Sequence, residues 1–286
     1  YLDIATGATT ILCTKAGCTH KGDTCEAHVT GFNLKWGGSC FWNGSLYYLD
    51  QPSADPIELV RCNAIGTERE VIGSLGIKYA EDQKTVIIQN SARAGNFWYY
   101  CADVQGSVWD EETQRWTSTR VASYISRIDL RTGKEEILFE EEEHDLDFYA
   151  AREDAVLFTV QEKHDVDNKD PDYREQLANI PISLKRWDGD TGQITTLFEK
   201  KSGEFTKIVG IYGDKAYYVA RGNNPADEYN NLYTLDLSTG ESALFIEQIG
   251  IAYWSGGFAK CIDSQSDKKW YILELASGKK LPIDVE

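Results

Sequence analysis

Three cysteines and two histidines cluster near the start of the chain, with the spacing Cys13-x4-Cys18-x-His20-x4-Cys25-x2-His28. Three thiolates and one imidazole make a tetrahedral zinc site, so we predict Cys13, Cys18, His20 and Cys25 as ligands. Cys18 and His20 are two residues apart, and an extended backbone points such side chains the same way. The alternative is a disulfide between two of the cysteines, with the third left free. Both interpretations give the cluster a structural role.

The run that begins at Leu12 and ends at Ala27 resembles a motif of uncharacterised exported β-propeller lipoproteins from Gram-positive gut anaerobes. That family has Asn after the first cysteine, Pro before the second and Asn after the third. Here these positions are Thr14, Ala16 and Glu26, which leaves the zinc candidates in place. The resemblance implies an extracellular protein with a TolB-like propeller, anchored to the outer face of the bacterial membrane, and it implies no particular activity.

A second group of oxygen-bearing residues lies in the acidic segment His164–Arg174. Asp165, Asp167 and Asp170 carry carboxylates of the kind that Ca²⁺ prefers. The segment lacks the Gly and the distal Glu of an EF-hand loop, so calcium competes with a solvated acidic rim as the interpretation.

Two tryptophans, Trp109 and Trp116, stand in the otherwise polar segment Val104–Arg120. Exposed indoles stack on sugar rings or anchor a protein partner. The alternative is a β-hairpin extension in which the two rings pair across the strands and cover the neighbouring blade. Arg221 opens another polar loop and is a further candidate for ligand contact, or an ordinary turn residue.

The sequence contains none of the common catalytic motifs: no G-x-S-x-G elbow, no H-E-x-x-H and no phosphate-binding glycine loop. We therefore expect an extracellular binding or interaction module without catalytic residues. The alternatives are a glycan-active enzyme, the gating propeller of a peptidase, or a structural docking subunit.

The element that must position these residues is a short hairpin that recurs six times. Each copy has an alternating apolar run, a turn with Gly near its end, and a second alternating run. The copies are Tyr1–Leu12, Leu59–Ile72, Ile125–Phe139, Leu184–Phe198, Leu232–Phe245 and Trp270–Ile283.

Another strand pair precedes every copy except the first, which gives repeating units of four strands. Such units are typical of β-propeller blades. We predict an all-β fold with one propeller domain over residues 1–286, favouring six blades with an incomplete N-terminal one; five or seven blades are the alternatives. A β-sandwich competes, but it would not naturally repeat one hairpin six times.

Long connections fall between the second and third strands of a unit and between units, and this meander places them on one face. The loop at residues 13–28 belongs to the same face. Loops on a rigid scaffold commonly carry binding sites, so we expect a protein or glycan ligand there.

The formal charge of −17 disfavours nucleic acids and anionic membranes as partners. No apolar run is long enough to span a membrane. Because Tyr1 falls inside a predicted strand, we expect the chain to be a fragment without its native N-terminus.

Overall fold

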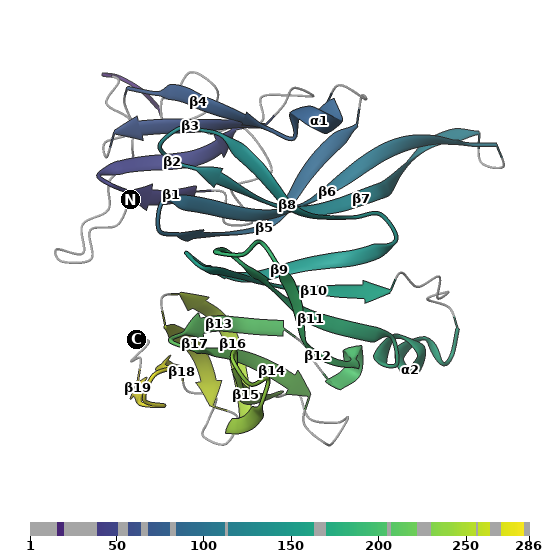
Figure 1. Ribbon diagram of the computed structural model, residues 1–286, viewed down its shortest axis with the longest axis vertical. Helices are drawn as coiled ribbons and strands as arrows, with labels where there is room; N and C mark the ends of the chain where they lie inside the picture. Colours follow the sequence, from purple (N-terminus) through teal and green to yellow (C-terminus); the bar gives the residue numbers. More distant parts are fainter. Residues whose placement is uncertain are drawn as a thin grey trace. The chain divides into compact units, whose positions relative to one another are not determined.

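Antiparallel strand meanders make up most of the described chain (Figure 1). The computed structural model describes residues 16–19, 39–50, 57–63, 68–80, 84–111, 114–162, 170–204, 207–221, 230–255, 257–263 and 270–282. They fall into two units, Tyr1–Glu142 and Glu143–Glu286, and each unit has its own sheets.

The first unit holds two four-stranded sheets in which neighbouring strands follow one another in the chain. The first sheet consists of β1 (Ser39–Trp42), β2 (Ser45–Asp50), β3 (Ile57–Asn63) and β4 (Glu70–Leu75). A one-turn helix, α1 (Ile77–Ala80), comes next in the chain. The second sheet consists of β5 (Thr85–Ala94), β6 (Phe97–Asp110), β7 (Arg115–Asp129) and β8 (Glu135–Glu141).

The second unit holds a four-stranded and a seven-stranded sheet. The smaller sheet consists of β9 (His144–Arg152), β10 (Ala155–Glu162), β11 (Pro181–Asp188) and β12 (Ile194–Lys201), with α2 (Tyr173–Ala178) between β10 and β11 in the chain. A short 3₁₀ helix (Ser202–Glu204) follows β12. The larger sheet consists of β13 (Lys207–Tyr212), β14 (Lys215–Arg221), β15 (Asn230–Asp236), β16 (Ser242–Ser255), β17 (Phe258–Asp263), β18 (Trp270–Glu274) and β19 (Lys280–Pro282).

Strand β16 belongs to two meanders at once. It pairs with β15 between Ser242 and Ile249, and with β17 between Ile249 and Ser255. Gln248, next to the change of partner, has a φ of 52°, and its backbone N–H donates to Asn231 Oδ1 at 3.0 Å. The large sheet therefore consists of two four-stranded meanders, β13–β16 and β16–β19. The described residues contain five such meanders, as the repeat predicts.

The predicted turn chemistry is present in four copies of the hairpin. Gly133, Gly192, Gly240 and Gly278 all have positive φ, between 67° and 74°. Glycine adopts this left-handed conformation without the steric cost that a Cβ brings. The turn glycines of the other two copies lie outside the described residues.

One position of the repeat is buried in every described copy. It is occupied by Cys62, Ile128, Trp187, Leu235 and Leu273, which are at most 5% exposed. Alternate residues of a strand point to opposite faces, so this position identifies the inward face of each hairpin. Cys62 is thus a small buried hydrophobe.

Two polar segments of the chain are mostly strand. Most of Val104–Arg120 continues β6 and begins β7, and most of Glu140–Asp147 ends β8 and begins β9. The first is a ribbon whose faces are both largely exposed, and the second lies at sheet edges, where charged residues are common. Neither shows the apolar alternation from which strands are inferred.

Candidate ligand-binding site

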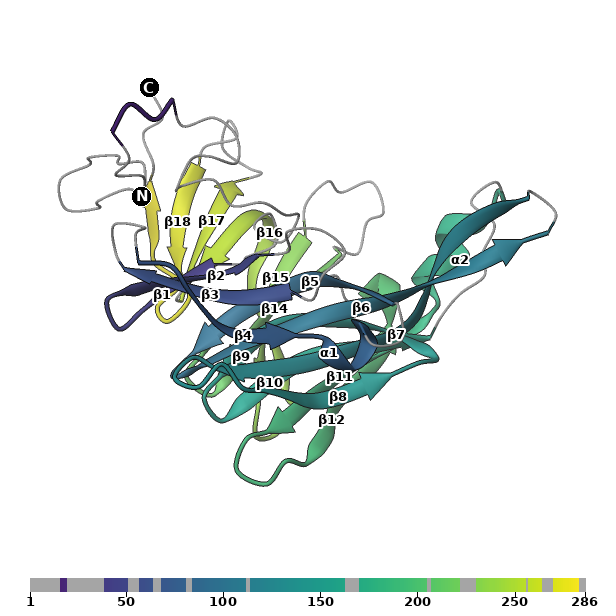
Figure 2. The same cartoon turned by 90° about the horizontal axis from the view of Figure 1, so that it is seen from above.

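Strands β6 and β7 run on past the other two strands of their own sheet (Figure 2). β5 pairs with β6 as far as Gln105, and β8 pairs with β7 only from Ser123 onward. Between Gly106 and Thr119, the two strands pair with each other alone among the described strands. A two-stranded ribbon is marginally stable by itself, so pairs of side chains across it must support it.

Trp109 and Trp116 form such a pair near the tip of the ribbon. They are directly opposite in register, and their ring centroids lie 5.6 Å apart with planes inclined at 66°. An edge-to-face pair contributes roughly 0.5–1.5 kcal/mol beyond the area it buries. The residues nevertheless remain 46% and 69% exposed. The cross-strand pairing that the hairpin interpretation predicts is therefore present, and both rings keep exposed surface.

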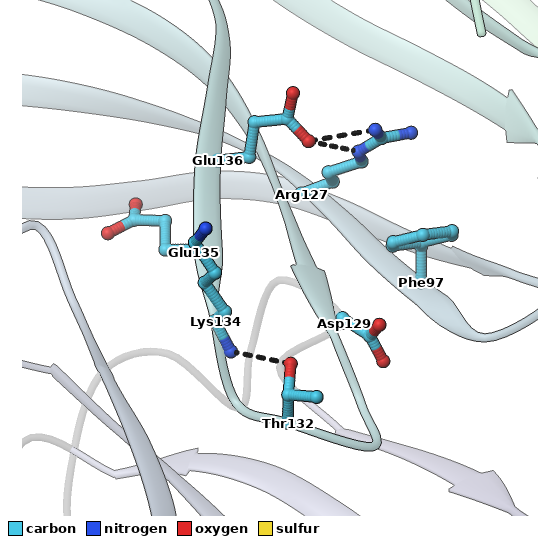
Figure 3. Close-up of a pocket in the computed structure, with 7 residues that line it drawn as sticks. All are labelled: Phe97, Arg127, Asp129, Thr132, Lys134, Glu135 and Glu136. Carbon is cyan, nitrogen blue, oxygen red and sulfur yellow. Dashed lines mark hydrogen bonds and ion pairs between the residues drawn. The ribbon is translucent and has the colours of Figure 1, made fainter. Parts of the chain in front are cut away.

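A pocket of about 420 Å³ lies beside the turn between β7 and β8 (Figure 3). It is lined by Phe97, Arg127, Asp129, Thr132, Lys134, Glu135 and Glu136. The guanidinium of Arg127 lies 4.5 Å from the ring centroid of Phe97, and its Nη2 lies 2.8 Å from Glu136 Oε2. Asp129 accepts hydrogen bonds from the Arg131 side chain, which hold the pKa of its carboxyl below the usual value.

The third acidic group of the pocket, Glu135, is bound on its inner side. Its Oε1 accepts hydrogen bonds from the hydroxyls of Tyr100 and Ser126, and its Oε2 accepts the backbone N–H of Gly76 at 3.0 Å. Every carboxylate that lines this pocket is thus engaged by a neighbouring donor.

Glu140, another glutamate of β8, forms a further set of contacts, with two residues of α1. It accepts the Tyr79 hydroxyl at 2.6 Å and lies 2.6 Å from Lys78 Nζ. Burial raises the pKa of Tyr100 and of Tyr79 well above the usual tyrosine value, so both hydroxyls stay protonated donors. These contacts are not predictable from the sequence, because in an acidic run each glutamate looks equally solvated.

The other predicted site residues are only partly described. Cys18 is half-buried, whereas Cys13, His20 and Cys25 lie outside the described residues, as do Asp165 and Asp167. Arg221 ends β14, and its side chain is outside the described part.

Asp170 has a local partner for each carboxylate oxygen, the backbone N–H of Asp172 and the side-chain amide of Gln176, both at 2.9 Å. It thereby holds the start of α2. The zinc and calcium sites stay predictions.

The described ranges of the chain contain neither a cluster of metal ligands nor a helix suited to span a membrane. No group of three or more His, Cys, Asp or Glu residues in these ranges is arranged to hold a metal ion. None of their helices has the length and apolar character that a membrane crossing requires. Cys261 is fully buried, and burial raises the pKa of its thiol to about 12.

No protein-family model matches the sequence, and no curated protein matches it. Several solved structures are similar in fold. An oligogalacturonate lyase in complex with manganese has a TM-score of 0.53 at 13% identity, over 86% of this chain and 64% of that chain. An oligogalacturonate lyase from Vibrio parahaemolyticus has a TM-score of 0.52 at 11% identity, with the same coverage of 86% and 64%. A puromycin hydrolase mutant complexed with PGG has a TM-score of 0.52 at 11% identity, over 87% of this chain and 37% of that chain.

These likenesses concern the fold alone, and the chain spans 64% of the length of the two lyases. Together with the four-stranded antiparallel meanders, they show the all-β, propeller fold class that the repeat predicts. Tyr1–Leu12, the predicted incomplete blade, lies outside the described residues. The number of blades therefore stays a prediction.

Proposed function

We propose that this chain is a ligand-binding module that contacts its partner through the tip of the β6–β7 hairpin. The observation that carries the proposal is the exposed Trp109–Trp116 pair at the end of two strands whose inner parts are buried. Tryptophan is enriched among the residues that dominate binding energy, because it offers a large and rigid contact area. The partner is a protein or a glycan.

The proposal places this module outside the cell, anchored to the outer face of a bacterial membrane. Its support is the resemblance of the Cys13–Cys25 motif to that of exported propeller lipoproteins. A rigid scaffold with an aromatic projection suits capture of a partner at a cell surface.

The experiment compares the wild type with the double variant Trp109→Ala/Trp116→Ala on arrays of immobilised glycans and peptides. Val108→Ala is the matched control, because Val108 is 50% exposed on the opposite face of the same ribbon. We expect ligands retained by the wild type and the control to bind the double variant at least roughly 30-fold more weakly, the equivalent of ~2 kcal/mol. A ligand held equally by all three proteins would overturn the proposal.

A glycan-active enzyme is the second candidate, favoured by the fold likeness to the two oligogalacturonate lyases. The engaged carboxylates of the β7–β8 pocket argue against that pocket as its catalytic centre. Incubation of the chain with oligogalacturonate, followed by assay of new chain ends, tests this candidate. Turnover above a heat-denatured control would favour the enzyme over the binding module. The likeness to puromycin hydrolase fits a further alternative, a propeller that gates a separate peptidase domain.

A further inference from the structure

The two faces of the β6–β7 ribbon differ in chemistry. Register places Ser107 opposite Ser118 and Gln105 opposite Arg120, on the same face as the tryptophan pair. The other face carries the pairs Val108–Thr117, Gly106–Thr119 and Asp110–Arg115. One face therefore combines two indoles with a row of hydroxyl and amide groups, and the other lacks aromatic residues.

Between the tryptophans and the body of the sheet, polar side chains on this face form hydrogen bonds with one another. Ser118 Oγ donates to Gln105 Oε1 at 2.7 Å, which orients the Gln105 amide along the face. Further down, Ser123 Oγ donates to Asp103 Oδ1 at 2.7 Å, and Gln89 Nε2 donates to Asp103 Oδ2 at 2.8 Å. Charged side chains on this face include Arg120, Asp103 and Glu141, the last opposite Ser123 in register, whereas Ser107, Ser118 and Gln105 line it nearer the tryptophans. Groups of this kind suit hydroxyl-rich, uncharged ligands.

The inclination of the two indoles selects the shape of the ligand. Rings inclined at 66° cannot both lie flat on one plane, so a flat surface such as crystalline polysaccharide could stack face to face on only one of them. A single flexible chain can place different residues against each ring. From Gln105 to Trp109 the face is ~14 Å long, at about 3.4 Å per residue, which accommodates several linked units.

We propose that the ligand of this face is a neutral, soluble oligosaccharide, a specification that rests on the proposed binding function. Sugar faces stack on Trp109 and Trp116, while Ser107, Ser118 and Gln105 exchange hydrogen bonds with ring hydroxyls. The formal charge of −17 works against acidic glycans, which reinforces the choice of an uncharged chain.

The test measures binding of the whole chain by calorimetry to a panel of neutral hexasaccharides, including cellohexaose, xylohexaose and mannohexaose. Hexagalacturonate and insoluble cellulose complete the panel. We expect at least one neutral hexasaccharide to bind, with affinity reduced at least tenfold by Trp116→Ala and within twofold of wild type in Val108→Ala.

A second variant tests binding without removing the tryptophan pair, whose loss could unfold the hairpin. Ser107→Ala/Ser118→Ala keeps both indoles, and we expect it to weaken oligosaccharide binding threefold or more without changing the thermal midpoint. If no neutral oligosaccharide binds while a peptide ligand still depends on the tryptophans, the glycan assignment is overturned and the binding function stands. Preferential binding of cellulose or hexagalacturonate overturns the neutral, soluble assignment. If no ligand of the wild type binds more weakly after the tryptophans are replaced, both proposals are overturned.

Discussion

At the residue scale, Asp236 shows how one exposed carboxylate shapes a turn. It accepts hydrogen bonds from the Ser238 hydroxyl and from the backbone N–H groups of Ser238 and Thr239. These bonds, of which the hydroxyl bond is the largest cause, lower the pKa of Asp236 from 3.8 to about 2. Asp188 repeats the arrangement with Thr191 in another copy of the hairpin. The charged carboxylate is therefore part of the hairpin's stability.

We expect Asp236→Ala to melt at a lower temperature than the wild type at neutral pH. The folded pKa lies below the unfolded value of about 3.9, so the stabilisation is present above about pH 4 and is lost as pH falls through about 2. Thermal unfolding at pH 7, 4 and 2 should show that the difference in melting temperature between the wild type and Asp236→Ala shrinks as the pH falls. Glu241→Ala, which removes an exposed carboxylate beside the same turn, is the control. If this difference in melting temperature does not change with pH, the destabilisation comes from the alanine substitution itself and not from loss of the charge.

The cysteine and histidine cluster permits a chemical test at the same scale. We expect elemental analysis to find stoichiometric zinc, because Cys13, Cys18, His20 and Cys25 supply a complete tetrahedral set. Chelation should release the zinc and expose thiols that were protected before, and His20→Ala should lower the zinc content. His28→Ala, outside the predicted set, should retain the metal.

The opposite result is as informative. Absence of zinc together with thiols that appear only after reduction would establish the disulfide alternative. Absence of zinc with every thiol reactive would exclude both interpretations of the cluster.

At the element scale, two glycines bring the sheets of the first unit into backbone contact. A Cβ at Gly133, in the turn after β7, would overlap the carbonyl oxygen of Ile72. A Cβ at Gly73, in β4, would overlap the carbonyl oxygen of Gly133. Gly133 also has a φ of 68°, so this position excludes other residues for two independent reasons.

We expect Gly133→Ala to reduce the free energy of unfolding by about 3 kcal/mol, the sum of left-handed strain and overpacking. Gly192→Ala is the matched control, because Gly192 has a φ of 67° and a Cβ there would meet no described atom within 4 Å. It should cost only about 1 kcal/mol. Urea titration of both variants checks the difference, and equal losses would show that the two sheets separate locally at little cost.

Sequence reasoning located elements where local chemistry repeats. The turn glycines were predicted because each hairpin carries the same signals. The polar β6–β7 ribbon lacked those signals, because most of its residues face solvent on both sides. The contacts of Glu135 with Tyr100 and Gly76 join residues 35 and 59 positions apart, and no local pattern predicts such pairs.

At the scale of the whole molecule, the dominant property is charge. The formal charge of −17 creates a negative potential around the chain, which repels anionic ligands over roughly a Debye length. That length is about 8 Å at physiological salt and about 30 Å at 0.01 M. The net charge therefore disfavours the approach of anionic ligands before they contact the ribbon.

This repulsion predicts different salt dependences for a charged and a neutral glycan of equal length. Affinity of the chain for hexagalacturonate should be weakest at 0.01 M salt and rise as screening grows, because the repulsion is long-ranged. Affinity for a neutral hexasaccharide should stay constant over the same range, since stacking and hydroxyl contacts carry no net charge. Calorimetric titrations of the wild type at 0.01 M and 0.15 M salt measure both trends. Affinity for hexagalacturonate that falls with added salt would instead reveal a basic attractive site that outweighs the overall charge. That result would favour the second candidate function, a glycan-active enzyme, over a module that binds neutral glycans.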